Sequence, residues 1–240
     1  SEEERVLEEI KREIDRIVKR ARELLEKYRE LVERIKRRNE EILKKYEKLL
    51  EEIERLADAG VPKEELLKLL REISKEHLKV LKELLDLVKE LSDVSLEALK
   101  ELLEELTRIV KEVLKALRRA DIPEVDKVIE TLERLLDELR EVVERIIKRD
   151  ADLLRKIEKV VRDIIETDKK LLEELERLIR AGVQERDLKR ALRRHAEELT
   201  RLNKELNELL KEHEDELRRL LAELDRIVRK LLRTLKELTE

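Results

Sequence analysis

The stretch Ala59-Gly60-Val61-Pro62 interrupts a pattern that is otherwise helical for long distances on both sides. Gly60 suits the left-handed conformation that ends many helices. Pro62 suits the first turn of a helix, where no backbone N–H is needed, and it pushes Val61 toward an extended backbone. These four residues therefore predict the end of one helix, a tight turn and the start of the next helix.

Two further segments repeat this arrangement at even spacing along the chain, Ala120-Asp121-Ile122-Pro123 and Ala181-Gly182-Val183-Gln184. Acidic residues follow each turn and basic residues precede two of them, as the helix dipole favours. The turns divide the chain into segments of about 58 residues, and turns this short make each helix antiparallel to the one before it. The predicted helices span about 2–59, 62–120, 123–181 and 184–239.

Apolar residues inside each segment return at alternating spacings of three and four, as in Leu199, Leu202, Leu206 and Leu209. This is the pattern of coiled-coil-like helix packing. Charged residues make up 51% of the chain, which would suit disorder, but hydrophobic residues make up 40% and are regularly spaced, so a core can form. We therefore expect an all-α, up-down-up-down antiparallel four-helix bundle that forms a single domain over residues 1–240.

The composition also argues against several classes of function. The 59 basic and 63 acidic residues give a net charge of −4, without the clustering that nucleic-acid binding needs. No apolar run is long enough to span a membrane, and no signal-peptide core is present. With no cysteine, the redox compartment is unreadable. We expect a soluble protein, suited to recombinant cytoplasmic expression, whose natural compartment the sequence leaves unknown.

Polar residues interrupt the apolar stripes at a few heights. Counting outward from the turns places position 28 level with 93, position 93 level with 150, and position 150 level with 214. One predicted layer holds Tyr28, Ser92 or Ser95, Asp150 and His213. A second layer, about 27 Å away at 1.5 Å per residue, holds Tyr46, Ser74 or His77, Asp168 or Thr167, and His195. Asn39 and Asn203 lie level with each other between the layers.

Asp150 is the most informative of these residues, because a lone carboxylate on an apolar stripe would cost several kcal/mol. Tyrosine, serine and imidazole donors would satisfy it in a structural polar network. The same residue types also allow a Ser-His-Asp catalytic arrangement, but regular helices offer neither a cleft nor free backbone donors for an oxyanion. A proton-sensing role for His77, His195 and His213 stays open. We therefore expect no enzymatic activity.

Metal and cofactor binding are not expected either. Helical bundles that hold two metal ions use Glu-x-x-His pairs. The residues three positions before the histidines are Ser74, Leu192 and Leu210. No Gly-rich phosphate-binding loop is present, since Gly60 and Gly182 are explained as helix ends. No small-molecule substrate is indicated.

The whole chain resembles de novo designed helical bundles that carry buried hydrogen-bond networks. The resemblance rests on the uniform Glu/Lys/Arg surface, the Leu/Ile/Val core, the short AGVP and ADIP turns and the polar residues on the apolar stripes. It implies a structural scaffold or rigid building block without natural biochemical activity, expected as a monomer. The alternatives are a designed protein–protein interaction module that pairs helical hairpins, with self-association or a designed partner, and a histidine-based pH-responsive bundle. The intended application and the handedness of the bundle stay open.

Overall fold

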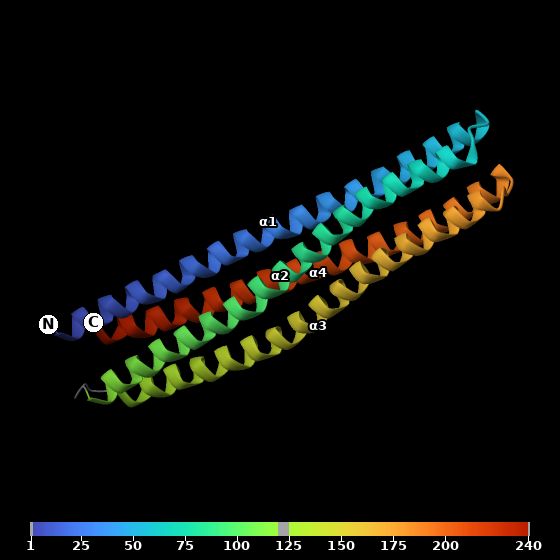
Figure 1. Cartoon of the computed structure of the whole chain (residues 1–240). Helices are drawn as coiled ribbons and strands as arrows, with labels where there is room; N and C mark the ends of the chain where they lie inside the picture. Colours follow the sequence, from blue (N-terminus) through green and yellow to red (C-terminus); the bar gives the residue numbers. More distant parts are fainter. Residues whose placement is uncertain (1, 120–124, 240) are drawn as a thin grey trace. The chain divides into compact units, whose positions relative to one another are not determined.

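The computed structural model describes residues 2–119 and 125–239, and within them the chain is all-α, with four helices and no strand. Figure 1 labels these helices along the chain. They are α1 (Glu2–Asp58), α2 (Lys63–Arg119), α3 (Val125–Arg180) and α4 (Glu185–Thr239). The predicted all-α class is confirmed, whereas the predicted turn at 120–123 lies outside the described residues.

The two described turns end their helices as the glycines predicted. Gly60 and Gly182 both have a φ of 66°, in the left-handed region. A Cβ added at either position would meet no atom within 4 Å, so the backbone angle alone favours glycine there. The N–H of Val61 donates to the carbonyl of Leu56 at 3.2 Å, and the equivalent bond closes the second turn at 3.2 Å. Both turns are therefore Schellman caps.

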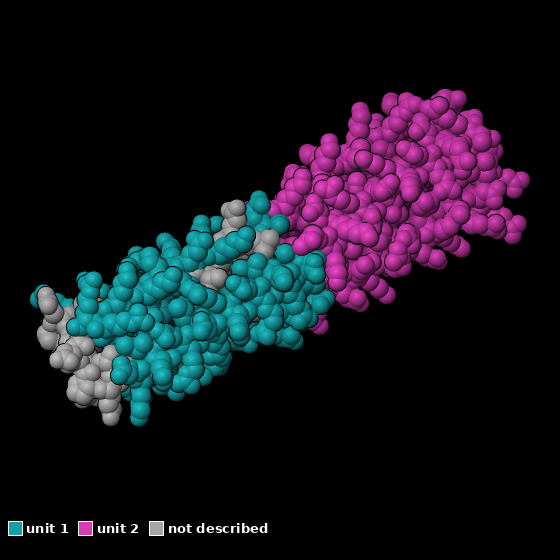
Figure 2. All heavy atoms as spheres, turned by 90° about the horizontal axis from the view of Figure 1, so that it is seen from below, with its two compact units in different colours: residues 1–29, 92–153, 212–240 teal, residues 30–91, 154–211 magenta. Residues whose placement is uncertain are grey.

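The chain divides into two compact units, each built from segments of all four helices (Figure 2). Unit 1 comprises residues 1–29, 92–153 and 212–240, and unit 2 comprises residues 30–91 and 154–211. That the chain forms a single domain over residues 1–240 stays a prediction.

Each unit has a core of buried Leu, Ile and Val side chains. In unit 1 the fully or almost fully buried residues include Ile14, Ile109, Leu132, Leu139 and Leu220. In unit 2 they include Ile35, Leu81, Leu84, Ile157, Ile164 and Leu171. The seven-residue spacing of Ile35, Ile42 and Leu49 brings all three into the core of unit 2. The apolar stripe predicted for this helix is therefore its buried face.

Candidate functional site

Unit 1 contains a buried polar cluster made by Tyr28 of α1, Asp150 of α3 and His213 of α4. Their side chains are 1%, 1% and 0% exposed. The Tyr28 hydroxyl bonds to Nδ1 of His213, and Nε2 of the same ring contacts Oδ1 of Asp150. The two ring centroids are 4.7 Å apart, with an interplanar angle of 31°. The structure thus brings together three residues that the sequence placed in one layer, and we call them the unit 1 cluster.

The contacts of the imidazole ring assign its tautomer. A hydroxyl that donates to Nδ1 leaves the ring proton of neutral His213 on Nε2, where it points to the Asp150 carboxylate. When Asp150 is ionised, the reverse tautomer would turn a lone pair toward that carboxylate. The tyrosine and the aspartate therefore contact the two different nitrogens of one imidazole ring.

Burial shifts the pKa values of Asp150 and His213 in opposite directions. It raises the pKa of Asp150 from 3.8 to about 7, with a further rise from the charge of Glu216. It lowers the pKa of His213 from 6.5 to about 3. In both groups the charged form is the one that loses hydration. Folding therefore favours a neutral imidazole and a protonated carboxyl in place of an ion pair.

Glu216 lies close enough to the unit 1 cluster to influence Asp150, and the sequence analysis did not identify it. Its side chain is 8% exposed, and it pairs with Arg149 at 3.3 Å and with Arg219 at 3.5 Å. It follows His213 by three residues, and such residues share a helix face. That spacing is the signal that identifies Glu216 as a neighbour of the cluster.

Unit 2 contains a second buried pair, His77 of α2 and Asp168 of α3. Nδ1 of His77 lies 3.4 Å from Oδ1 of Asp168, and the side chains are 3% and 0% exposed. Burial raises the pKa of Asp168 from 3.8 to about 7. Burial and, to a smaller extent, the charge of Lys45 lower the pKa of His77 to about 4, against an opposing effect of Glu76. We call His77 and Asp168 the unit 2 pair.

A neutral amide contact accompanies this pair in unit 2. Nδ2 of Asn39 on α1 donates to Oδ1 of Asn203 on α4, and both side chains are buried. The sequence register placed these residues level with each other, and the structure brings them together. An amide pair needs no charge to be desolvated, so it costs less to bury than the two His–Asp contacts.

His195 does not lie where the sequence placed it. Its ring is 18% exposed, and Nε2 lies 2.5 Å from Oε2 of Glu174 on α3. The hydrogen bond from His195 is the main reason that the pKa of Glu174 is lowered. The prediction that His195 joins the second layer is wrong, because a shared height does not fix the angle at which a side chain leaves its helix.

The hydroxyl residues also depart from the predicted layers. Ser74 donates to the carbonyl of Leu70 in its own helix at 2.7 Å, a common alternative for serine inside a helix. Ser92 and Thr167 are half-buried. Among the described side chains, no hydrogen bond joins either of them to the unit 1 cluster or to the unit 2 pair. The side chains of Ser95 and Tyr46 lie outside the described residues.

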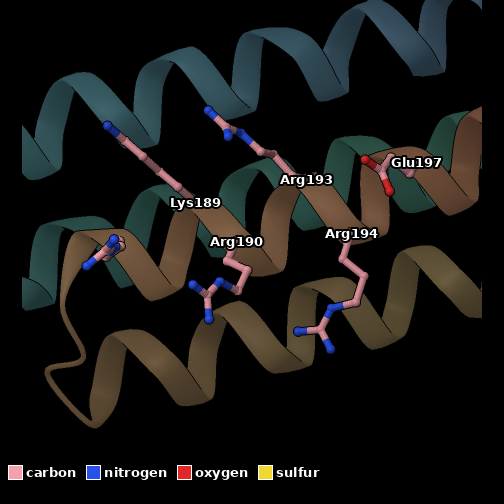
Figure 3. Close-up of a pocket in the computed structure, with 6 residues that line it drawn as sticks. Lys189, Arg190, Arg193, Arg194 and Glu197 are labelled. Atoms are coloured by element: carbon pink, nitrogen blue, oxygen red, sulfur yellow. The ribbon is translucent and has the colours of Figure 1, made fainter.

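Two surface hollows of unit 2 are lined by charged side chains. One, of about 400 Å³, lies beside the start of α4 and is lined by Arg186, Lys189, Arg190, Arg193, Arg194 and Glu197. Figure 3 shows Lys189 and Arg193 directed to one side of α4, and Arg190 and Arg194 to the other. These cations diverge and do not surround a common point, so they fit a solvated helix face better than an anion site.

The second hollow, of about 560 Å³, lies between α1 and α2. It is lined by charges of both signs, and Arg38 pairs there with Glu41 at 2.9 Å and with Glu83 at 3.1 Å. Neither hollow is lined by a residue of the unit 1 cluster or the unit 2 pair. The arrangement supports proton transfer among buried side chains more directly than it supports a reaction on a bound substrate.

No group of three or more His, Asp and Glu side chains in the ranges 2–119 and 125–239 is arranged to hold a metal ion. None of the helices, over those same ranges, combines the length and the apolar character needed to cross a bilayer.

Comparison with known proteins gives no assignment. No protein-family model matches the chain, and neither the curated proteins nor the solved structures contain a significant match.

Proposed function

We propose that the chain is a designed structural scaffold, a rigid building block of the kind represented by de novo helical bundles with buried hydrogen-bond networks. The observation that carries the proposal is the unit 1 cluster, in which Tyr28, His213 and Asp150 contact one another across three helices. The cluster is buried and faces no described hollow. On this proposal the polar residues serve to specify the structure.

The buried polar residues distinguish one helix register from its neighbours. Seven residues on either side of Asp150 lie Val143 and Ile157, and seven on either side of His213 lie Leu206 and Leu220, all of them buried. A slip of one heptad, about 10 Å at 1.5 Å per residue, therefore exchanges one apolar layer for another at little cost. The same slip strands the carboxylate, which costs several kcal/mol.

We propose further that the whole chain forms one up-down-up-down antiparallel four-helix bundle, monomeric, with helices of about 58 residues. Helices of 57, 57, 56 and 55 described residues, joined by two described tight turns, support this architecture. Light scattering coupled to size exclusion, together with small-angle scattering, tests it. An obligate dimer would contradict the monomer and favour the interaction-module alternative.

The register role is testable with cysteine pairs, because the chain has no native cysteine. Arg29 of α1 and Glu214 of α4 lie 3.9 Å apart at their charged ends, so Arg29→Cys/Glu214→Cys reports the native register. Arg22→Cys/Glu214→Cys, one heptad away on the exposed face of α1, reports the slipped register. A short bismaleimide should link only the first pair in the parent background.

The same two cysteine pairs are then placed in a background whose unit 1 cluster is replaced by Tyr28→Leu, Asp150→Leu and His213→Leu. An all-apolar layer of this kind is neutral or stabilising in several proteins. We expect the second pair to be linked more there than in the parent background, because the unit 1 cluster no longer disfavours the slipped register. Linkage of the first pair alone in both backgrounds would show that the cluster does not set the register.

A pH-responsive bundle is the second candidate, since two buried His–Asp contacts are present. The opposite pKa shifts of Asp150 and His213 argue against it over a wide range. Between the ordinary values of 3.8 and 6.5, the unfolded pair carries one proton on the imidazole and the folded pair carries one on the carboxyl. Equal proton numbers give no dependence of stability on pH.

A further inference from the structure

We propose that Tyr28 is a one-electron redox site, at which an outer-sphere one-electron oxidant removes an electron from the phenol while His213 accepts the hydroxyl proton. The proposal rests on the contacts of the unit 1 cluster and goes beyond a scaffold role. The ligand class is a one-electron acceptor that reacts through the protein and does not need to touch the ring.

The geometry supplies the proton acceptor that tyrosine oxidation needs. The Tyr28 hydroxyl bonds directly to Nδ1 of His213, and the two rings lie 4.7 Å apart. A phenol that loses an electron becomes a strong acid, so a base already hydrogen-bonded to the oxygen removes the need for a charged intermediate in a dry core. The ring must be neutral to accept the proton, and burial of His213 favours that neutral form.

Asp150 completes the path on the far side of the ring, because its Oδ1 contacts Nε2 of His213. The Tyr28 O–H bond breaks and a proton binds to Nδ1. Above the raised pKa of Asp150, about 7, this carboxyl is ionised, so the Nε2–H bond breaks and that proton binds to Oδ1 of Asp150. One electron reduces the oxidant, and the products are a neutral phenoxyl radical, a neutral imidazole and a neutral carboxylic acid. The cluster changes its charge by one unit, which equals the electron removed.

Burial also protects the product. Tyr28 is 1% exposed, so its radical cannot meet the radical of a second molecule. Electrons transfer through a packed protein interior without contact, whereas the proton moves only along the hydrogen bonds of the cluster. The site therefore allows the electron to leave and retains the proton and the radical.

The test mixes the full-length protein with hexachloroiridate(IV) and follows the tyrosyl radical by absorbance and by electron paramagnetic resonance. The chain has two tyrosines, so Tyr28→Phe and Tyr46→Phe form a matched pair. We expect the persistent radical to be lost in Tyr28→Phe and retained in Tyr46→Phe. A persistent radical that survives Tyr28→Phe overturns the proposal.

The role of the proton acceptors has its own variant. Asp150→Leu/His213→Leu removes both without leaving a buried charge, and it should slow oxidation of Tyr28 about 100-fold, the usual contribution of a positioned base. Circular dichroism shows whether this variant folds. If it does not, Asp150→Asn, which cannot accept the second proton, replaces it and should also slow the reaction. Oxidation at the parent rate in the folded variant contradicts the proposal.

Discussion

The unit 1 cluster and the unit 2 pair each contain a buried contact between a histidine and an aspartate, but the lengths of these two contacts differ. His213 is contacted at both ring nitrogens, by Tyr28 and by Asp150. His77 lies at a looser 3.4 Å from Asp168, and Lys45 and Glu76 are close enough to influence its pKa. In both rings, burial of the imidazole is the largest cause of the lowered pKa. The pKa is lowered to about 3 in the more buried ring and to about 4 in the other.

The largest effect is expected in variants that keep only one of Asp150 and His213, because their opposite pKa shifts then no longer compensate each other. In Asp150→Leu only His213 remains, with a pKa lowered from 6.5 to about 3. The unfolded state then binds a proton that the folded state does not, so stability falls as pH falls through this window, by about 1.4 kcal/mol per pH unit. Chemical denaturation at a series of pH values measures the slope.

His213→Leu should show the opposite slope. Asp150 alone, with a pKa raised from 3.8 to about 7, keeps its proton in the folded state and loses it in the unfolded state. Stability is therefore highest at low pH and falls as pH rises toward 7. The parent protein should show neither slope between 3.8 and 6.5. Slopes of the same sign in both variants would contradict the numbers of protons assigned to the folded and unfolded states.

The next effect compares the two histidines at neutral pH. His213→Leu removes the partner of both Tyr28 and Asp150, and a stranded buried polar group costs about 1–3 kcal/mol. His77→Leu breaks the longer contact with Asp168 and should cost less. Urea denaturation of the two variants, with the parent as control, gives the difference. An equal or larger loss in His77→Leu would show that contact length does not rank the two sites.

A smaller effect is expected in acid, where the two units of the parent protein should lose stability to different extents. Between the two pKa values, about 4 for His77 and about 3 for His213, most of His77 is protonated in the folded state, whereas most of His213 is neutral. Unit 1 therefore loses about 0.7 kcal/mol more than unit 2 over this one pH unit. Hydrogen exchange read by mass spectrometry on peptides of each unit should show unit 1 opening first. Simultaneous opening would mean that the two rings titrate alike.

The sequence predicted the helix ends and part of the site for physical reasons that can be separated. Gly60 and Gly182 fix helix ends because a left-handed backbone angle is a local property. The heights of Tyr28, Asp150 and His213 follow from counting residues at a constant rise. Local and additive quantities such as these are readable from one sequence.

Side-chain direction and choice of partner are not readable in the same way. A helix turns by about 100° per residue, so a residue at the expected height can leave its helix in another direction. The side chain of His195 does so and contacts Glu174 at the flank. A serine can satisfy its hydroxyl within its own helix, as Ser74 does with Leu70, and then needs no partner in the layer. The register therefore gives the height of a polar group and leaves its contacts to packing.

The smallest effects test the edges of the two sites. Ser92 and Thr167 were predicted as layer members, but both are half-buried and make no hydrogen bond to the described residues of either site. Substitutions away from cores and networks usually change stability by less than about 0.5 kcal/mol. Ser92→Ala and Thr167→Val should therefore leave the urea midpoint almost unchanged. Both variants keep the helix and remove only the hydroxyl, so a loss above about 1 kcal/mol would show that a hydroxyl belongs to a buried layer. Such a loss in Ser92→Ala alone would extend the closed cluster of unit 1 to α2 and widen its difference from unit 2.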